Sequence, residues 1–463
     1  MLADSVLTTP LHLLIVPIGA AGLAILFRRW TAFSGLVALS ALVVTFMLVM
    51  VLDTDSGSSI LTFTIQLDTR ARLPLLAVTG LLALTLVFHL IRSQGEFFPA
   101  TTCVLAAVLI AAAMIYTRYV VAAALLQLAH VVAAMGILGT VPTQRIGVTV
   151  LRYALMMTIG GALIVLGLLL VDQYRVSPET ELSVRAIAAV LAVGFGTLLA
   201  AAPLYFWLPD VAYRAPVMGF ILIAAILHTA TTTFLVSVMA TFPWLSNDAQ
   251  LNATAALGGL ATVLIGALLA FSANDLRGLL GYSTVSASGF IIIGIASRSA
   301  LAVTGILYQA LAMAAALFLL AILVGVIEER LGGASFAQLA GLTSRAPLLT
   351  LAFIVGSFSI VGVPGFASFP GRWLVFQAAS QQGEWFLFTL LAGSGLLMLA
   401  YARALRACLQ PVQIPGRISP FSRSGSIMAM LVALLCCGLG IYPSPIFSAI
   451  LDVVKDLSFV RAV

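Results

Sequence analysis

The chain has 463 residues, of which 62% are hydrophobic and only 8% are charged, and its formal net charge is +6. Soluble globular proteins carry about 25% charged residues, and a water-soluble fold of this length could not withdraw so much apolar surface from solvent. The basic residues are scattered at the ends of apolar runs rather than clustered, which excludes a nucleic-acid partner. The composition therefore indicates an integral membrane protein whose solvent is the lipid bilayer.

Fourteen apolar runs are long enough to cross the hydrocarbon core, which requires about 20 residues in a helix. Their hydrophobicity is continuous, whereas the strands of a membrane β-barrel alternate polar and apolar residues. The first run ends on Arg28 and Arg29 and has no basic residues before it, so we expect a retained helix and no cleavable signal peptide. The predicted spans are about 11–28, 33–52, 73–91, 99–116, 119–139, 147–171, 185–207, 217–242, 253–272, 279–297, 300–327, 347–368, 384–407 and 425–449.

The loops between the predicted spans are short, and none could fold around a core of its own. We therefore expect neither a nucleotide domain nor a flavin domain. The four cysteines have no spacing typical of a metal or cluster site, so we expect no metal and no cofactor. Twelve arginines follow odd-numbered spans and seven follow even-numbered spans. This bias predicts odd-numbered loops in the cytoplasm and both termini on the outer face of the inner (cytoplasmic) membrane.

The stretch FWLPDVAYRAPVMGFILIAAILH, residues 206–228, places prolines and polar groups inside this apolar chain. Pro203, Pro209 and Pro216 interrupt helical hydrogen bonding and predict a helix end, a short surface turn and a restart. His228 lies roughly three turns into the following span, where an imidazole must be paired or hydrated. Because its ordinary pKa is about 6.5, an imidazole at this place can accept and release protons.

Three further side chains of this stretch have expected architectural roles. Trp207 is expected at a bilayer interface. Asp210 can cap the exposed amides of a helix start, and Arg214 is placed to pair with it. His228 also has a purely structural alternative, because hydrogen bonds to Thr229 or Thr232 would satisfy the ring without a role in transport.

Four stretches resemble the antiporter-like subunits of respiratory complex I, the L, M and N type subunits of NADH-quinone oxidoreductase, and their relatives in Mrp cation antiporters. AAAPLYFWLPDVAYRAP is similar to the signature PFHxWLPDAYxGAP, and FSANDLRGLLGYSTVSASGFIIIGI, which contains Asp275 and Arg277, is similar to DLKRLLAYSSISHLG. The resemblance keeps the order and spacing of the elements from about 100 to 380. The four stretches are 150–170, 200–216, 271–295 and 345–379.

The resemblance implies an all-α polytopic membrane protein of about 14 transmembrane helices, with two inverted five-helix repeats and broken helices. The predicted span count agrees with that architecture. On this basis we expect helices 1–3 at 1–98, a first repeat of helices 4–8 at 99–242 and a second repeat of helices 9–13 at 243–407. The last helix and the tail are expected at 408–463.

The resemblance also implies which residues carry ions. Counting from Pro216, His228 takes the place of a Lys or His in the broken eighth helix of the family, at the midpoint of the channel. Arg372 takes the place of the Lys or Glu of the twelfth helix. A guanidinium stays charged at all relevant pH values and cannot release a proton. Arg372 therefore has either an electrostatic role or, as the alternative, anchors its helix by snorkelling to the interface.

The sequence departs from the family pattern at three positions. Gln127 takes the place of the glutamate of the fifth helix, Leu198 the lysine of the seventh and Ala314 the lysine of the eleventh. The Glu–Lys pair of the family works because the pKa of the lysine changes as the pair opens and closes, and these replacements do not titrate. His130, one turn after Gln127, is a candidate substitute for the lost charge.

Three functions agree with these observations. The first is translocation of protons or cations by a membrane subunit of a larger complex, with His228 as the central titrating group and Gln127, His130 and Arg372 on the same polar axis. The second is a divergent structural subunit that docks other membrane subunits without conducting. The third is the membrane half of a two-subunit ion or inorganic-carbon uptake system. No catalytic residue is expected, because a self-sufficient redox enzyme would need a cofactor motif.

Overall fold

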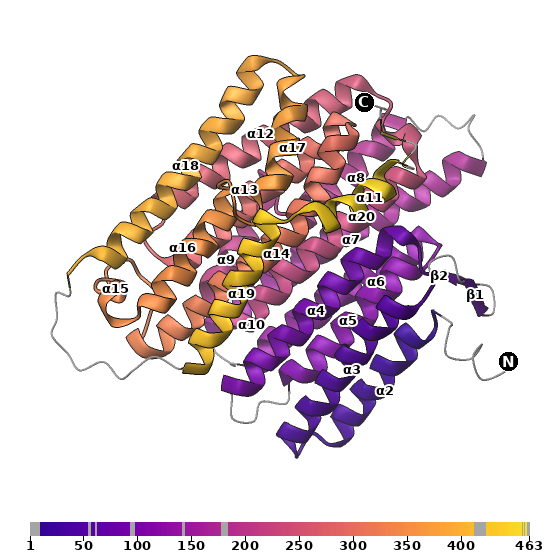
Figure 1. The fold of residues 1–463 in the computed structure, drawn as a ribbon. Helices are drawn as coiled ribbons and strands as arrows, with labels where there is room; N and C mark the ends of the chain where they lie inside the picture. The colour runs from indigo at the N-terminus through magenta and orange to yellow at the C-terminus, as the bar shows by residue number, and fades with distance from the viewer. Residues whose placement is uncertain are drawn as a thin grey trace. The chain divides into compact units, whose positions relative to one another are not determined.

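The computed structural model describes residues 10–53, 57–60, 63–92, 98–140, 144–176, 184–411, 423–455, 457 and 459–460. Nearly all of these residues lie in helices, as Figure 1 shows. The exception is a small antiparallel sheet of β1 (Gly57–Ile60) and β2 (Phe63–Gln66), in which Gly57 pairs with Gln66. The predicted all-α class is therefore correct.

Within the described residues, ten helices are long and apolar enough to cross a membrane, and four shorter apolar helices accompany them. Each of the fourteen overlaps one predicted span in the predicted order, and ten of them meet the length needed to cross. The helices are α2 (His12–Leu26), α3 (Thr31–Val51), α4 (Thr69–Arg92), α5 (Phe98–Ile115), α6 (Tyr119–Thr140), α7 (Gln144–Val176), α8 (Val184–Leu198), α10 to α11 (Val217–Thr241), α12 (Ala249–Ser272), α13 (Leu276–Ser297), α14 (Ala300–Leu331), α16 (Pro347–Val361), α18 (Glu384–Leu409) and α19 (Arg423–Ile441).

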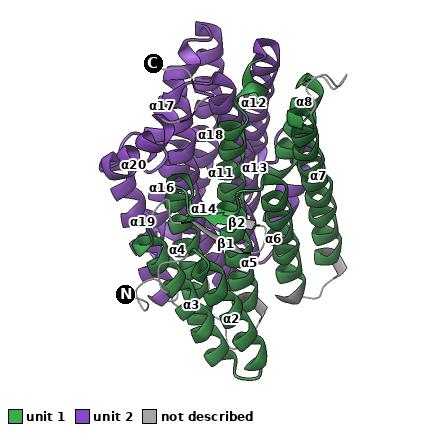
Figure 2. Ribbon diagram, turned by 90° about the vertical axis from the view of Figure 1, so that its right-hand side faces the viewer, with its two compact units in different colours: residues 1–198, 226–247 green, residues 199–225, 248–463 purple. Residues whose placement is uncertain are grey.

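The chain divides into two compact units, coloured separately in Figure 2. Unit 1 comprises residues 1–198 and 226–247, and unit 2 comprises residues 199–225 and 248–463. In unit 1, helices α5, α6, α7 and α8 pack in sequence order. In unit 2, α12 packs most extensively on α13. The boundaries of the two inverted repeats stay a prediction.

Glycines set the close approach of α12 and α13. A Cβ placed on Gly259 would lie 2.9 Å from the carbonyl oxygen of Gly289, and one on Gly289 would lie 2.5 Å from the carbonyl oxygen of Gly259. Small residues permit such approach in membrane proteins, where helices associate through packing rather than through the hydrophobic effect. Neither glycine could therefore be replaced by a larger residue without separating the two helices.

The segment between α8 and α10 differs from the expected surface turn. After a 3₁₀ turn at Leu204–Phe206, the chain forms an eight-residue helix, α9 (Trp207–Arg214), before it restarts after Pro216. Pro209 lies in the first turn of α9, where a missing backbone N–H costs nothing. Trp207 is only 2% exposed, so its ring packs inside the protein, and its expected place at the bilayer interface stays a prediction.

The helix that follows is irregular at its centre. α10 (Val217–Phe220) leads into a π-helical segment, η2 (Ile221–Leu227), and α11 (His228–Thr241) continues as a regular helix. π-helical turns are rare and occur frequently at functional sites. The sequence did not predict this segment, because its residues are uniformly apolar.

The twelfth predicted span ends earlier than expected. α16 stops at Val361, and α17 (Phe369–Ser380) starts a new helix beyond Gly362 and Gly365. Both glycines have positive φ angles, +80° and +88°, a conformation that glycine adopts without steric cost. The last span ends at Ile441 rather than at 449, and α20 (Ser444–Lys455) follows as a separate amphipathic helix. The short α15 (Leu342–Arg345) precedes α16.

Candidate functional site

A buried histidine and a buried tyrosine form the centre of a polar cluster in unit 1. His130 on α6 is 2% exposed and Tyr153 on α7 is fully buried. The imidazole Nδ1 lies 2.8 Å from the phenolic oxygen, which is a normal hydrogen-bond distance. The other ring nitrogen, Nε2, is buried and has no hydrogen-bond partner among the described residues. The tyrosine therefore orients the ring and leaves Nε2 available for a proton.

Gln127 lies one turn before His130 on α6. Its side-chain oxygen and nitrogen are both buried and have no hydrogen-bond partner within the described residues. A Cβ on Gly161 of α7 would lie 2.1 Å from the amide oxygen, so the amide packs directly over this glycine. A buried unpaired amide costs roughly 1–3 kcal/mol. The cluster thus holds a polar group that a mobile water or ion can engage.

His228 is the first residue of α11 and follows the π-helical segment. It is 7% exposed and, like His130, belongs to unit 1. The hydroxyl of Thr232 donates to the backbone carbonyl of His228 at 2.8 Å. This bond engages the main chain rather than the ring. Unit 1 therefore brings together three of the predicted relay residues, Gln127, His130 and His228, and adds Tyr153, which the sequence had not indicated.

Arg372, the fourth predicted relay residue, belongs to unit 2 and is fully buried on α17. Its Nη1 and Nη2 donate to the carbonyl oxygens of Val361 and Ile360 at 2.9 and 2.7 Å. These are the last carbonyls of α16, which have no partner within their own helix. The guanidinium carbon also lies 4.5 Å from the centre of the Phe290 ring.

Arg372 therefore acts as a side-chain cap for a helix that ends inside the protein. A cation at a helix C-terminus is favourable because of the helix dipole. The snorkelling alternative is wrong, since the side chain is fully enclosed and bound to this helix end. Other polar atoms near the break have no hydrogen-bond partner among the described residues. They are Arg372 Nε, both amide atoms of Gln309, and the hydroxyls of Ser286, Ser359 and Ser368.

Arg277 holds three helices of unit 2 together. It makes two hydrogen bonds to Glu328 at the end of α14, 2.5 and 2.6 Å long. It also donates to the carbonyl oxygens of Ala212 and Ala215 at 3.1 and 2.6 Å. Only a planar guanidinium can serve a carboxylate and two carbonyls at once. The residue is thus a structural clamp on the end of α9.

The remaining motif residues are architectural as well. Asp275 is the N-cap of α13 and accepts from the backbone N–H of Gly278 at 2.8 Å. Asp210 and Arg214 form the expected ion pair on α9, 3.1 Å long. Tyr213 between them has its hydroxyl bonded to Asp275, and its pKa is raised, chiefly by burial and also by the charge of Asp275. Phe206, the residue before α9, makes no side-chain hydrogen bond that would cap this helix.

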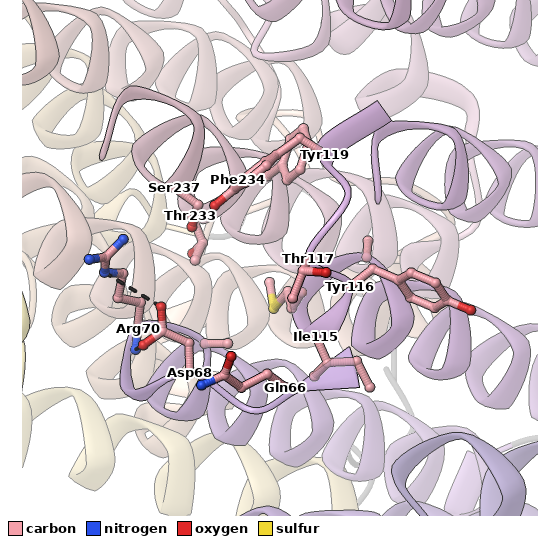
Figure 3. Close-up of a pocket in the computed structure, with 13 residues that line it drawn as sticks. Gln66, Asp68, Arg70, Ile115, Tyr116, Thr117, Tyr119, Thr233, Phe234 and Ser237 are labelled. Carbon is pink, nitrogen blue, oxygen red and sulfur yellow. Dashed lines mark hydrogen bonds and ion pairs between the residues drawn. The ribbon is translucent and has the colours of Figure 1, made fainter. Parts of the chain in front are cut away.

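A cavity of about 220 Å³ opens in unit 1, close to the start of α4 and α6 and beside α11 (Figure 3). Its polar lining includes Asp68 and Arg70, which form an ion pair 3.5 Å long. Tyr119 also lines it and hydrogen-bonds Thr241 at 2.7 Å. None of the predicted relay residues lines this cavity. The polar stretch before the third span was the only sequence signal for it.

Two of the three positions that depart from the family pattern are apolar and enclosed. Leu198 is 3% exposed and Ala314 is 6% exposed. A Cβ on Gly160 would lie 2.4 Å from a methyl group of Leu198, so this leucine fills a packing contact. In the described part of the chain, no group of three His, Cys, Asp or Glu side chains is placed to bind a metal.

The fold is that of a polytopic helical membrane protein. Residues 105–397 match the family described as NADH:quinone oxidoreductase/Mrp antiporter, transmembrane, and the chain belongs to this family. The predicted resemblance is therefore confirmed.

Individual relatives agree with this assignment. NADH-quinone oxidoreductase subunit M of Pseudomonas aeruginosa is 31% identical over 261 residues, covering 55% of this chain and 50% of the relative. F(420)H(2) dehydrogenase subunit M of Methanosarcina mazei is 29% identical over 285 residues, covering 59% and 56%. The matched part of the chain thus spans about half the length of these relatives.

Solved structures share the fold over nearly the whole chain. One chain of respiratory complex I from Thermus thermophilus superposes with a TM-score of 0.79 at 18% identity, covering 96% of this chain and all of that one. One chain of the Mrp complex from Dietzia sp. gives 0.83 at 17% identity, covering 99% and 98%. At these identities the likeness establishes the fold, and it confirms a multi-pass membrane architecture.

Proposed function

We propose that this antiporter-like membrane subunit translocates protons within a hetero-oligomeric complex of the cytoplasmic membrane, with His228 as the central titrating group. Relatives are subunits of NADH-quinone oxidoreductase and F(420)H(2) dehydrogenase, which supports other membrane subunits as partners. The observation that carries the proposal is that unit 1 encloses both His130 and His228, and that the Nε2 atom of His130 has no hydrogen-bond partner among the described residues.

The chemistry of the cluster fits proton transfer between neighbouring groups. An imidazole binds a proton on one nitrogen and releases it from the other, and its ordinary pKa lies near neutrality. Tyr153 holds His130 through Nδ1, so exchange takes place at Nε2. Gln127 cannot ionise, but its amide can donate to one water and accept from another. It supports a hydrated path without supplying the charge of a glutamate.

A second candidate is a docking subunit that does not conduct. The replacement of ionisable family residues by Leu198 and Ala314 favours it, and so does the full engagement of both terminal guanidinium nitrogens of Arg372 with helix carbonyls. In that case the complex would assemble normally and ion flux would be independent of this subunit.

The test is proton flux in proteoliposomes that contain the purified complex, measured with a pH-sensitive dye. His228→Ala is expected to abolish the flux driven by the complex. His89→Ala is the matched control, because His89 is also a buried histidine, 6% exposed, but belongs to α4. It is expected to leave the flux unchanged.

Mass spectrometry of the co-purified subunits shows whether each variant still assembles. Wild-type flux from a fully assembled His228→Ala complex would contradict the relay and leave the docking role. Iron–sulfur or quinone-site subunits among the partners would identify a redox-driven pump component. Other antiporter subunits alone would identify exchange of the Mrp type.

A further inference from the structure

We propose that the loop between α2 and α3 is a binding site for the phosphate headgroup of an anionic phospholipid. The loop consists of Phe27, Arg28, Arg29 and Trp30, between the end of α2 at Leu26 and the start of α3 at Thr31. Arg28 and Arg29 are exposed, and their side chains make no hydrogen bond or ion pair with any described residue. The loop itself contains no acidic residue.

The backbone of this loop is held in place. The N–H of Trp30 donates to the carbonyl of Phe27 at 2.8 Å, and the N–H of Ser34 donates to the carbonyl of Trp30 at 2.9 Å. The hydroxyl of Ser34 reaches back to the carbonyl of Ala24 on α2 at 3.2 Å. The two arginines are thus presented from a fixed turn, which lowers the entropic cost of binding a ligand.

Three aromatic rings lie beside the arginines. The Phe27 and Phe33 rings meet edge to face with centroids 5.0 Å apart, and the Trp30 ring lies 6.1 and 6.4 Å from them. Trp30 is nevertheless 67% exposed and Phe33 is 43% exposed. Exposed tryptophans of membrane proteins lie at the level of the lipid headgroups, so this cluster places Arg28 and Arg29 at the same depth.

Below the loop, the helix pair offers a surface for acyl chains. Figure 1 shows α2 and α3 side by side in indigo, and they pack on each other. Their outer faces expose large apolar side chains, among them Ile18 at 55%, Leu26 at 73% and Leu36 at 60%. Charge, headgroup depth and apolar flank together fit a single occupant, an anionic phospholipid. The loop also belongs to the side predicted to be cytoplasmic, where basic segments attract anionic lipids.

The test is native mass spectrometry of the purified protein with cardiolipin, phosphatidylglycerol or phosphatidylcholine added in detergent. The wild-type protein is expected to retain the two anionic lipids in preference to phosphatidylcholine. Each arginine near a membrane surface contributes roughly a fivefold gain in affinity for anionic lipid, so the double variant Arg28→Gln/Arg29→Gln is expected to lose about thirtyfold. Inorganic phosphate at the same concentration is expected not to displace the lipid.

The matched control is Arg345→Gln/Arg406→Gln. It removes the same charge from the side that is also predicted to be cytoplasmic, at two arginines that form no ion pair with any described residue. If both double variants lost the same affinity for anionic lipid, net charge alone would explain the binding and the proposed site would be wrong. A wild-type protein that binds all three lipids equally would also contradict the site. If inorganic phosphate displaced the lipid, the two arginines would bind a soluble anion instead, and the lipid site would be wrong.

A labelling experiment separates lipid from protein as the occupant. Cys introduced at Arg29 is expected to react with a water-soluble thiol reagent both in native membranes and in the isolated subunit. Reaction in the isolated subunit alone would show that a partner protein covers the loop, and the lipid site would then be wrong.

Discussion

The polar interior of unit 1 and that of unit 2 use different chemistry. Unit 1 encloses three histidines, His89, His130 and His228, and the Nε2 atom of His130 and the amide of Gln127 have no hydrogen-bond partner among the described residues. Unit 2 encloses a permanent cation, Arg372, whose terminal nitrogens are engaged by the carbonyls of a helix end. A buried charge is tolerated when it is compensated and hydrogen-bonded. On the proposed function, unit 1 is the place of proton exchange, whereas Arg372 in unit 2 fixes the end of a helix.

The largest expected loss of stability comes from a substitution in unit 2 that removes the cap of α16. Arg372→Met keeps much of the side-chain volume but removes both bonds to the end of α16. Hydrogen bonds to charged groups contribute about 1.5–3 kcal/mol each, so the loss of unfolding free energy is expected to reach about 3–5 kcal/mol. Thermal unfolding in mild detergent measures it. Arg345→Met is the control, since its side chain makes no such bonds, and an equal effect there would contradict the capping role.

The second prediction tests whether a positive charge alone at position 277 is enough to hold the helices of unit 2 together. Arg277→Lys retains the charge but cannot bind Glu328 at two points while donating to Ala212 and Ala215. We expect a loss of about 2 kcal/mol in unfolding free energy. Increased proteolysis near residue 214 should accompany it, because α9 loses its anchor. Arg330→Lys, at an exposed position near the same helix end, should leave both readouts unchanged.

The third prediction concerns the packing of unit 1. In Gly161→Ala the new methyl group meets the amide of Gln127, and overpacking of this kind costs about 1–3 kcal/mol. The double variant Gly161→Ala/Gln127→Ala should recover most of this loss, because the obstructing group is gone. Strictly additive losses would show that the two residues do not interact. Unfolding midpoints of the two single variants and the double variant measure the coupling.

The smallest expected effect isolates one hydrogen bond of the relay cluster. Tyr153→Phe removes the partner of His130 Nδ1 with little change in shape, and we expect a loss of about 1 kcal/mol. Proton flux should fall further than this stability loss implies, because the ring of His130 is no longer oriented. Tyr174→Phe on the same helix serves as the control. Unchanged flux in a stable Tyr153→Phe protein would remove the tyrosine from the relay.

The sequence predicted the membrane spans well because hydrophobicity is the physical requirement for each of them. It did not reveal where α16 stops, since a helix end enclosed by protein needs no polar residues when Arg372 supplies the hydrogen bonds. The cluster Gly362, Pro364 and Gly365 was the available signal for this break. Tyr153 was also missed, because a tyrosine in an apolar run is usually a packing residue, and only its distance to His130 identifies it.

The burial of Trp207 was missed for a related reason. Tryptophan is frequent at bilayer interfaces, but this one packs inside a small helix that no hydropathy pattern distinguishes from a turn. The predicted pairing of Asp210 with Arg214 was correct, because four residues separate neighbours on a helix face. Local spacing therefore predicted local contacts, whereas contacts between distant helices required the structure.

The π-helical segment before His228 has a consequence for how substitutions in this region should be interpreted. Hydrogen bonds in a π-helix span five residues instead of four, so Ile221–Leu227 accommodates one residue more than a regular helix of the same reach. One extra residue in a helix offsets every later side chain by about 100° from its place in an uninterrupted helix of the same sequence. A one-residue deletion inside this segment would remove the extra residue, restore regular winding and leave His228 close to the face that it occupies now. Substitutions that straighten the segment without a deletion would instead turn the histidine by about 100°.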